Sequence, residues 1–234
     1  MCGRYDSLIP RDAMEQLFEA KAEASSNFPP RYNIAPTQEV PIVKPARDGG
    51  GREIAMARWG LVPFYMKSIP KVPHINARAE GVDRTGLFRE AFAARRCLVP
   101  ATGFYEWERR DGAKQPYRFR LRSGEPFAFA GLWEYAKIDG EGLLSMTIIV
   151  TAANELVARI HDRMPVILSP ADYSRWIDPG GVGAKELLKP FPPGLMESYP
   201  VSSFVNHYEN DNEECIRPVV LGKEGGAQLG LPGL

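Results

Sequence analysis

The chain has 234 residues, of which 44% are hydrophobic and 25% charged, the composition of an ordinary globular protein rather than a disordered one. Its 29 basic and 29 acidic residues give a net charge of zero, which argues against indiscriminate binding to polyanions but is compatible with a local basic groove. No apolar run reaches the roughly 20 residues of a transmembrane helix, and the N-terminus lacks the apolar core of a signal peptide. The three cysteines form neither a CxxC pair nor an even disulfide framework. We therefore expect a cytoplasmic protein with no membrane partner.

Helical periodicity appears at few places. Residues 11–24 carry apolar side chains at helical spacing and predict the first helix. Residues 85–96 predict a second helix, with one apolar side and arginines in the last turn. Two shorter helices are expected, one capped by Asn154 and ending near His161, the other running from Ser169-Pro170 to Trp176.

Strand-like runs are more frequent than helical ones. They are predicted at residues 39–44, 53–59, 97–99, 104–108, 117–121, 127–133, 145–151 and 164–168. Residues 117–122 alternate aromatic or apolar residues with arginines, as a strand with one face in the core should. This pattern predicts an α+β fold: a single domain with a curled, mostly antiparallel β-sheet core and a few peripheral helices. We expect the domain to cover residues 2–220 and residues 221–234 to form a glycine-rich mobile tail.

Arginines cluster at residues 84–96 and again at residues 109–122. Such a cluster can line a groove for a phosphate backbone, but composition alone favours a solvated face.

Cys2 carries the most distinctive chemistry. Because its side chain is small, we expect the initiator methionine to be removed, leaving an α-amine beside a thiol. The amine has a reference pKa of about 7.7–8.0, so part of it is free base near neutral pH and can add to an aldehyde to give a Schiff base. The thiol can then close on the imine carbon to form a thiazolidine ring. Cys2 taken alone can also stand at this position by chance.

Seven motifs follow one another in the order typical of one family. The sequence resembles the SRAP proteins (SOS-response-associated peptidase family), which process abasic sites. The motifs are MCGRY at the start, RYNIAPTQ at 31–38, WGLVP at 59–63, INARAE at 75–80, GFYEW at 103–107, HDRMPVIL at 161–168 and VSSFVN at 201–206. Together they span most of residues 2–219.

The resemblance implies a monomeric protein that binds abasic single-stranded DNA in a basic groove, forms a covalent crosslink to the opened deoxyribose and protects the lesion during the DNA damage response. By matching position, Cys2 is the nucleophile and Asn76 orients the sugar. Glu106 holds and deprotonates the α-amine, and His161 passes protons to and from the sugar oxygen. The implied DNA-binding residues are Arg4, Arg78, Trp107, Tyr65 and Arg163. When bound to DNA, the protein would be associated with the nucleoid.

These residue types suit the implied roles. An abasic sugar is mostly a closed hemiacetal, and opening it needs a proton on the ring oxygen, which a histidine can deliver near neutral pH. A carboxylate can take the proton of the α-amine, although its charge also favours the ammonium form. An asparagine offers donors and an acceptor to hydroxyls without adding charge.

Other interpretations stay open at this point. A thiol peptidase would use Cys2 as nucleophile and His161 as base. One form of this alternative is a peptidase that acts only on its own N-terminus. A single-strand or gap-binding module would carry Cys2 incidentally. On sequence alone, His161 can be a capping or core residue, Glu106 can lie on the solvent face of a strand, and Asn76 can form a turn. No HExxH, CxxC, GxGxxG or Walker pattern occurs, so we expect no metal and no cofactor.

Overall fold

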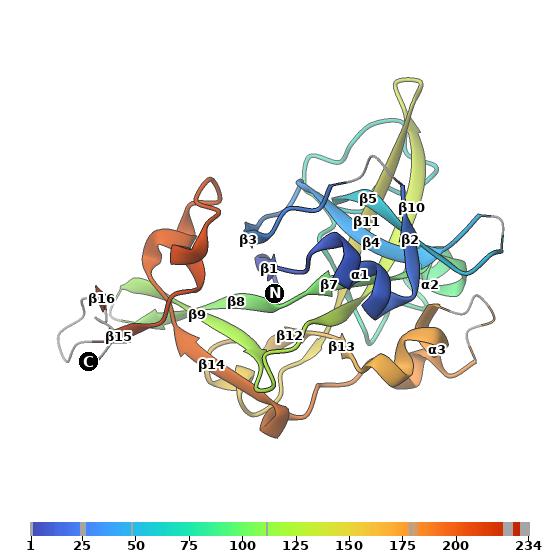
Figure 1. Cartoon of the computed structure of the whole chain (residues 1–234). Coiled ribbons are helices and arrows are strands. Elements are labelled where there is room, and N and C mark those ends of the chain that lie inside the picture. The colour runs from blue at the N-terminus through green and yellow to red at the C-terminus, as the bar shows by residue number, and fades with distance from the viewer. Residues whose placement is uncertain are drawn as a thin grey trace.

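The structure is a computed structural model that describes residues 2–23, 27–47, 49–110, 112–177, 180, 182–221 and 227–229. Strands are the main regular secondary structure, and helices are few and short (Figure 1). The strands are β1 (Tyr5–Ser7), β2 (Ala20–Ala22), β3 (Arg31–Ile34), β4 (Glu39–Pro45), β5 (Arg52–Trp59), β6 (Asn76–Arg78), β7 (Arg96–Ala101), β8 (Gly103–Arg110), β9 (Ala113–Leu121), β10 (Phe127–Ile138), β11 (Glu141–Ala152), β12 (Arg163–Pro165), β13 (Ile167–Leu168), β14 (Met196–Pro200), β15 (Val219–Leu221) and β16 (Ala227–Leu229). The α-helices of the described part are α1 (Arg11–Phe18), α2 (Arg89–Ala94) and α3 (Tyr173–Ile177), and short 3₁₀ turns connect several elements.

Two large sheets form the body of the molecule. The larger sheet has nine strands. Seven follow the order β12-β11-β10-β7-β4-β5-β2, and the other two are β13, paired to β10, and β6, paired to β11. The smaller has the order β14-β9-β8-β1-β3. Most pairings are antiparallel, and the parallel ones join β2 to β5, β5 to β11 and β6 to β11. The predicted fold class is therefore confirmed: a sheet-rich α+β domain with few helices.

Aromatic side chains join the two sheets. Phe104 of β8 stacks on Phe119 of β9 with ring centroids 5.0 Å apart, and Tyr5 of β1 meets Phe129 of β10 edge to face at 5.7 Å. All four rings are buried. Because buried aromatic pairs bring large apolar areas out of water, this cluster fixes the smaller sheet, and with it the start of the chain, against the larger sheet.

The first predicted helix ends earlier than expected. Residues 11–24 were expected to be helical, but α1 stops at Phe18, and Glu19 takes a left-handed conformation with φ of 49°. That conformation ends a helix, and the following residues instead pair with β5 as strand β2. Residues 20–22 form backbone hydrogen bonds with β5, and the helical spacing of the apolar residues does not predict this pairing.

The second predicted helix, at residues 85–96, shortens to α2, and Arg96 belongs to β7. Arg96 is buried, and its Nη1 donates to the backbone carbonyls of Phe92 and Ala93 at 2.6 and 3.1 Å, while its Nε donates to the carbonyl of Trp176. Arg96 thus donates hydrogen bonds from β7 to backbone carbonyls at the end of α2 that have no partner within the helix. This part of the arginine cluster is therefore not a solvated face.

The arginine alternation at residues 117–122 is likewise not a simple solvent face. Arg118 is buried and donates to both carboxylate oxygens of Asp6, at 2.8 and 2.7 Å, and Asp6 has no exposed surface. Thr102 also donates its hydroxyl to Asp6 at 2.5 Å. A β-carbon at Gly103 would lie 2.7 Å from Asp6 Oδ2 and 2.8 Å from Arg118 Nε, which explains the glycine at this position.

The other predicted elements are located near their expected places. Asn154 caps the turn at Val157–Arg159 by accepting from the backbone N–H groups of Leu156 and Val157. The strand predicted at 164–168 is interrupted at Val166 and forms β12 and β13. Within the predicted tail, residues 227–229 pair with β15, and residues 222–226 and 230–234 lie outside the described residues. No helix in the described ranges is both long and apolar enough to cross a bilayer.

Candidate functional site

The start of the chain runs antiparallel beside β8. Tyr5 pairs with Phe104, and the carbonyl of Arg4 accepts from the backbone N–H of Tyr105 at 3.0 Å. Cys2 is fully buried and packs in the same apolar cluster as Tyr5 and Phe104. Burial, followed by the negative charge of Glu106, raises the pKa of the Cys2 thiol far above its ordinary value. The thiol is therefore protonated at neutral pH.

Glu106 extends from β8 toward the start of the chain. Its side chain is buried, and burial raises its pKa to about 7. The positive charge of the N-terminus, which belongs to Met1 in the unprocessed chain, acts in the opposite direction, and the charge of Asp162 raises the pKa of Glu106 further. This environment gives Glu106 a pKa close to the reference value of an α-amine, so the sequence-based alternative of a solvent-facing strand residue is wrong.

His161 lies just before β12. Its Nδ1 accepts from the backbone N–H of Arg163 at 3.0 Å, which leaves the proton of the neutral ring on Nε2. The Asp162 carboxylate also lies 3.0 Å from Nδ1, but its side chain is 85% exposed and water screens its charge. Burial, and then the charge of the α-amino group, lower the pKa of His161 below its ordinary value. At neutral pH the ring is therefore a neutral donor at Nε2.

Asn76 begins β6, which lies on the opposite side of β11 from β12. Its Nδ2 donates to the carbonyl of Ile148 at 3.4 Å, and Ile148 packs in the same cluster as Cys2. The Oδ1 atom of Asn76 is buried and has no hydrogen-bond partner among the described residues. A buried acceptor without a partner is costly, so this oxygen is suited to receive a hydrogen bond from a ligand hydroxyl.

Charges connect the predicted catalytic residues: that of Glu106 acts on the Cys2 thiol, and that of Asp162 acts on both Glu106 and His161. Asn76 contacts Ile148 of β11, which packs in the same apolar cluster as Cys2. Cys2 is thus connected to Glu106 by charge and to Asn76 through β11.

An open groove of ≈ 460 Å³ extends from Asn76. Its polar lining consists of His74, Asn76, Arg78, Glu80 and Arg163, together with Thr85. The first four alternate along an extended segment and so share one face. Arg78 is exposed, and Arg163 forms an ion pair with Glu80 across the groove. Two of the predicted DNA-binding arginines therefore lie in one groove with the predicted sugar-orienting residue.

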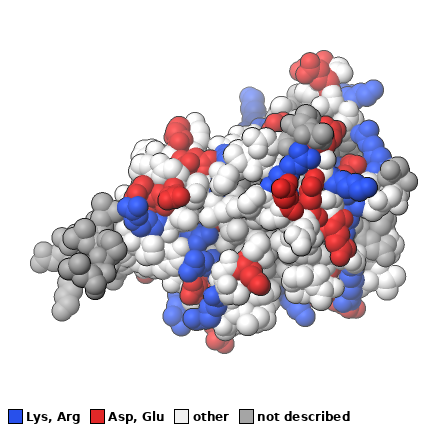
Figure 2. Space-filling model, in the orientation of Figure 1, with Lys and Arg blue, Asp and Glu red and all other residues white. Residues whose placement is uncertain are grey.

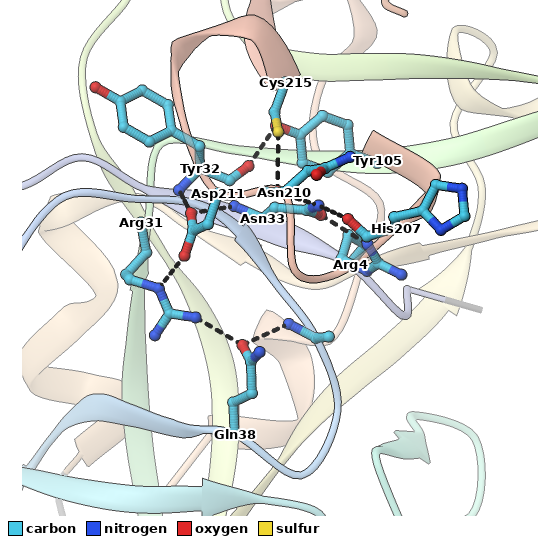
Figure 3. Close-up of polar contacts among 11 residues, drawn as sticks. Arg4, Arg31, Tyr32, Asn33, Gln38, Tyr105, His207, Asn210, Asp211 and Cys215 are labelled. Carbon is cyan, nitrogen blue, oxygen red and sulfur yellow. Dashed lines mark hydrogen bonds and ion pairs between the residues drawn. The ribbon is translucent and has the colours of Figure 1, made fainter. Parts of the chain in front are cut away.

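Arg4 and Trp107 lie together on the other side of the site. The guanidinium carbon of Arg4 is 5.8 Å from the centroid of the Trp107 ring, and the indole Nε1 donates to Asn206 at 2.7 Å. Arg4 Nη1 donates to Asn33 Oδ1 at 2.7 Å (Figure 3). It also donates to the carbonyl of Val205 at 2.8 Å. One nitrogen of this predicted phosphate contact is thus bound within the protein.

Tyr65 follows the WGLVP motif and is 53% exposed. It meets Phe64, itself 51% exposed, edge to face at 5.4 Å. Neither ring lines the groove at Asn76. The pair presents aromatic faces to solvent, which is the arrangement that stacking on an unpaired base requires.

The surface charge is mixed. On the face seen in Figure 2, basic and acidic side chains are interspersed, in keeping with the net charge of zero. No group of three or more potential metal-binding His, Cys, Asp or Glu side chains occurs in the part of the chain that the structure describes.

Comparison with known proteins agrees with these motifs. A family model described as SOS response associated peptidase (SRAP) matches residues 1–208. The chain belongs to the SRAP family. It is 38% identical over 224 residues to the abasic site processing protein YoqW of Bacillus subtilis, covering 92% of this chain and 99% of that protein. It is 31% identical over 238 residues to the abasic site processing protein HMCES of Xenopus tropicalis, covering 88% of this chain and 71% of that one.

Solved structures have the same SRAP-like fold. A protein from Bacteroides thetaiotaomicron superposes with a TM-score of 0.84 at 25% identity, over 94% of this chain and all of that one. A protein from Bordetella bronchiseptica superposes with a TM-score of 0.76 at 27% identity, over 86% of this chain.

Four positions in this SRAP domain were not singled out as site residues from the sequence. His74 lines the groove, Gly103 makes room for the ion pair beneath β1, and Asn33 and Asn206 hold Arg4 and Trp107. The asparagines and the glycine lie inside the quoted motifs, so the motifs themselves carried the signal. What was missing was the partner of each side chain, which only the fold supplies.

Proposed function

We propose that this chain processes abasic sites by covalent capture: the α-amine and thiol of Cys2, freed by removal of Met1, form a thiazolidine with the opened sugar in single-stranded DNA. The observation that supports this most is the fully buried Cys2 beside the buried Glu106, whose charge acts on the Cys2 thiol. Several relatives are named abasic site processing proteins, which supports the same substrate.

The first step is opening of the sugar. The bond between C1′ and the ring oxygen breaks, the ring oxygen gains a proton, and the C1′ hydroxyl loses its proton to leave an aldehyde. His161 is suited to supply the proton, since its neutral ring carries a hydrogen on Nε2. Asn76 is suited to hold the sugar, because its buried Oδ1 can accept from a hydroxyl.

The second step is attack by the amine on C1′. Its nitrogen must first lose a proton, and Glu106 is the neighbouring base. With a pKa of about 7 for Glu106 and a reference value of about 7.7–8.0 for an α-amine, transfer between them costs little free energy. The carbinolamine that forms then loses its oxygen as water to give the imine.

The third step closes the ring. The sulfur of Cys2 adds to the imine carbon, and the thiol proton moves to the nitrogen, so that one C–S bond forms and the C=N bond becomes single. Burial keeps the thiol protonated at rest, which suits a sequence in which the amine attacks first and the thiol second. A peptidase needs a thiolate from the start, so the same burial favours capture over the peptidase alternative.

DNA would reach the site through the groove at Asn76. Arg78 and Arg163 would contact phosphates there, while Tyr65 and Trp107 would meet bases and Arg4 would lie close to the lesion. We propose that the protein acts as a cytoplasmic monomer, associated with the nucleoid while it is bound to DNA.

The experiment combines intact-mass spectrometry with a denaturing gel. The mature protein and a Cys2→Ala variant are each incubated with an abasic-site oligonucleotide and, separately, with the matched intact oligonucleotide. We expect a shifted band with the abasic strand only, and none with the variant. If mass spectrometry shows that Met1 is gone and no band shifts, the capture proposal is wrong and the peptidase alternative becomes the better one.

A further inference from the structure

Two family motifs, at residues 31–38 and 201–206, have no part in the chemistry proposed above. The fold brings both motifs to the side chain of Arg4, which donates to Asn33 and to the carbonyl of Val205. Figure 3 shows the contact with Asn33. Asn33 is fully buried at the centre of this contact. Because Asn33 is buried, its role is to hold neighbouring groups in place.

The Asn33 side chain joins Arg4 to the segment that follows β14. Its Oδ1 accepts from Arg4 Nη1 at 2.7 Å. Its Nδ2 lies within hydrogen-bonding distance of three backbone carbonyls, those of Val205, His207 and Asn210, at 3.1, 2.9 and 2.7 Å. The same carbonyl of Val205 accepts from Arg4 Nη1 at 2.8 Å. One side chain thus orients both the guanidinium and the loop that receives it.

Asp211 fixes Asn33 from the other side. Its carboxylate accepts from the backbone N–H groups of Tyr32 and Asn33 and forms an ion pair with Arg31. Rotating Asn33 away from Arg4 would remove the donor from three loop carbonyls, of which that of Val205 belongs to a buried residue. The receptor for Arg4 is therefore rigid.

Arg4 in turn lies against Cys2. Its backbone N–H lies close enough to the Cys2 sulfur to lower the pKa of the thiol, and its carbonyl accepts from the backbone N–H of Tyr105, the residue before Glu106, at 3.0 Å. Holding the Arg4 side chain thus fixes a backbone that contacts the nucleophile on one side and the strand of the proposed base on the other.

We propose that Asn33 is a positioning residue for covalent capture: by holding Arg4, it keeps the amine and sulfur of Cys2 aligned with Glu106. The measured quantity is the rate of the capture reaction, so the inference rests on the proposed function. It predicts an effect on the rate of the chemical step and none on the affinity for DNA.

The test is single-turnover capture of an abasic oligonucleotide by the mature chain, over a range of oligonucleotide concentrations. We expect Asn33→Ala to lower the saturating rate by about 10- to 100-fold, since small misplacements of reacting groups have effects of this size. The half-saturating concentration should stay unchanged. An unchanged saturating rate, or a change in half-saturation alone, would overturn the proposal.

A double-mutant cycle tests whether Asn33 acts through Arg4. The variant with both Asn33→Ala and Arg4→Ala should be no slower than the slower single variant, because both remove one interaction. Rates that multiply would contradict the coupling. Gln38→Ala is the matched control: Gln38 accepts from Arg31 and from the backbone of Ala35 and has no hydrogen bond to Arg4. Equal slowing in this control, at equal loss of thermal stability, would also overturn the proposal.

Arg4→Lys covers the case in which Asn33→Ala fails to fold. Lysine keeps the positive charge but lacks the planar guanidinium that spans Asn33 Oδ1 and the Val205 carbonyl. Its saturating rate should fall in the same way, and an unchanged rate would contradict the inference. If the wild-type chain captures DNA and the variants match it, the inference alone fails. If the wild-type chain forms no adduct, the proposed function and this inference fail together.

Discussion

The backbone carbonyl of Arg4 accepts a hydrogen bond from the backbone N–H of Tyr105 at 3.0 Å. This contact continues the pairing of β1 with β8 and brings Cys2 alongside the strand that carries Glu106. Since the charge of Glu106 also acts on the Cys2 thiol, the two side chains belong to one electrostatic unit. In the proposed reaction, the segment before β1 presents Cys2 to Glu106, which β8 holds in the smaller sheet.

Glu106 should make the stability of the chain depend on pH. Burial raises its pKa from the ordinary 4.5 to about 7, so between these values the folded state binds more protons than the unfolded state. Stability from this group is therefore present below about pH 4.5 and is lost as pH rises toward 7. Glu106→Gln should be more stable than the wild type above pH 7, by on the order of 2 kcal/mol, with the difference vanishing near pH 4.5.

Denaturant unfolding at several pH values measures this difference. The same variant should also lose the rise in capture rate that the wild type shows as pH increases through about 7, with little change in affinity for DNA. Equal losses of rate and affinity would rule out the proton-transfer role.

His161 should matter for the sugar and not for binding. His161→Ala removes the Nε2 donor and should slow capture of an abasic sugar, or its reversal, while the noncovalent affinity stays constant. His207→Ala is the control, because this histidine is exposed and contacts Asn33 only through its backbone carbonyl, so its loss should change the rate little. Equal capture rates for wild type and His161→Ala would contradict the assignment.

The groove arginines should appear in the salt dependence of binding. In a Cys2→Ala background, which isolates noncovalent binding, Arg78→Ala and Arg163→Ala should each weaken affinity for single-stranded DNA and reduce the slope of log K against log salt by about 0.7. Arg175 of α3, paired with Glu186, lies outside the groove and serves as the control. A slope that Arg175→Ala changes as much as the groove variants do would argue against this path for the DNA.

Gly103 should be intolerant of a side chain. The β-carbon of Gly103→Ala would approach Asp6 Oδ2 to 2.7 Å and Arg118 Nε to 2.8 Å, so the buried ion pair beneath β1 must shift. We expect a loss of about 1–3 kcal/mol in the free energy of unfolding, measured with denaturant. Gly194→Ala, whose β-carbon meets nothing within 4 Å, should leave it nearly unchanged. Similar losses in both variants would show that space around the ion pair is not the cause.

The strands and the fold class could be predicted because their signals are local. Alternation, glycine turns and apolar runs located most strands, including both sides of the β10–β11 hairpin, whose turn places Asp139 and Gly140 at positive φ. The end of α1 at Phe18 could not be predicted, because the next residues are recruited by β5, which lies far along the chain. The helical spacing of apolar residues carries no information about pairing with a strand so far along the chain.

The site shows the same division. The motifs identified Cys2, Glu106 and His161, since each has a chemistry that its residue type suggests. Nothing local distinguishes Arg118, which is buried on Asp6, from the neighbouring arginines in its strand. Likewise, Asn33 acquires a role through its contact with Arg4, 29 positions away, and through contacts with residues more than 170 positions away. The roles of Arg118 and Asn33 depend on partners that are distant in the sequence, and only the fold shows those partners.

The central claim is that both the amine and the thiol of Cys2 hold the sugar, and a Cys2→Ser variant tests it most directly. Serine keeps the amine but has no thiol, so it can form the imine without the thiazolidine. Mature wild type and variant are incubated with an abasic oligonucleotide, heated, and run on a denaturing gel with and without borohydride. We predict a heat-stable band for the wild type in both lanes and for the variant only with borohydride. A heat-stable band for Cys2→Ser without borohydride, or a wild-type band that needs borohydride, would contradict the account.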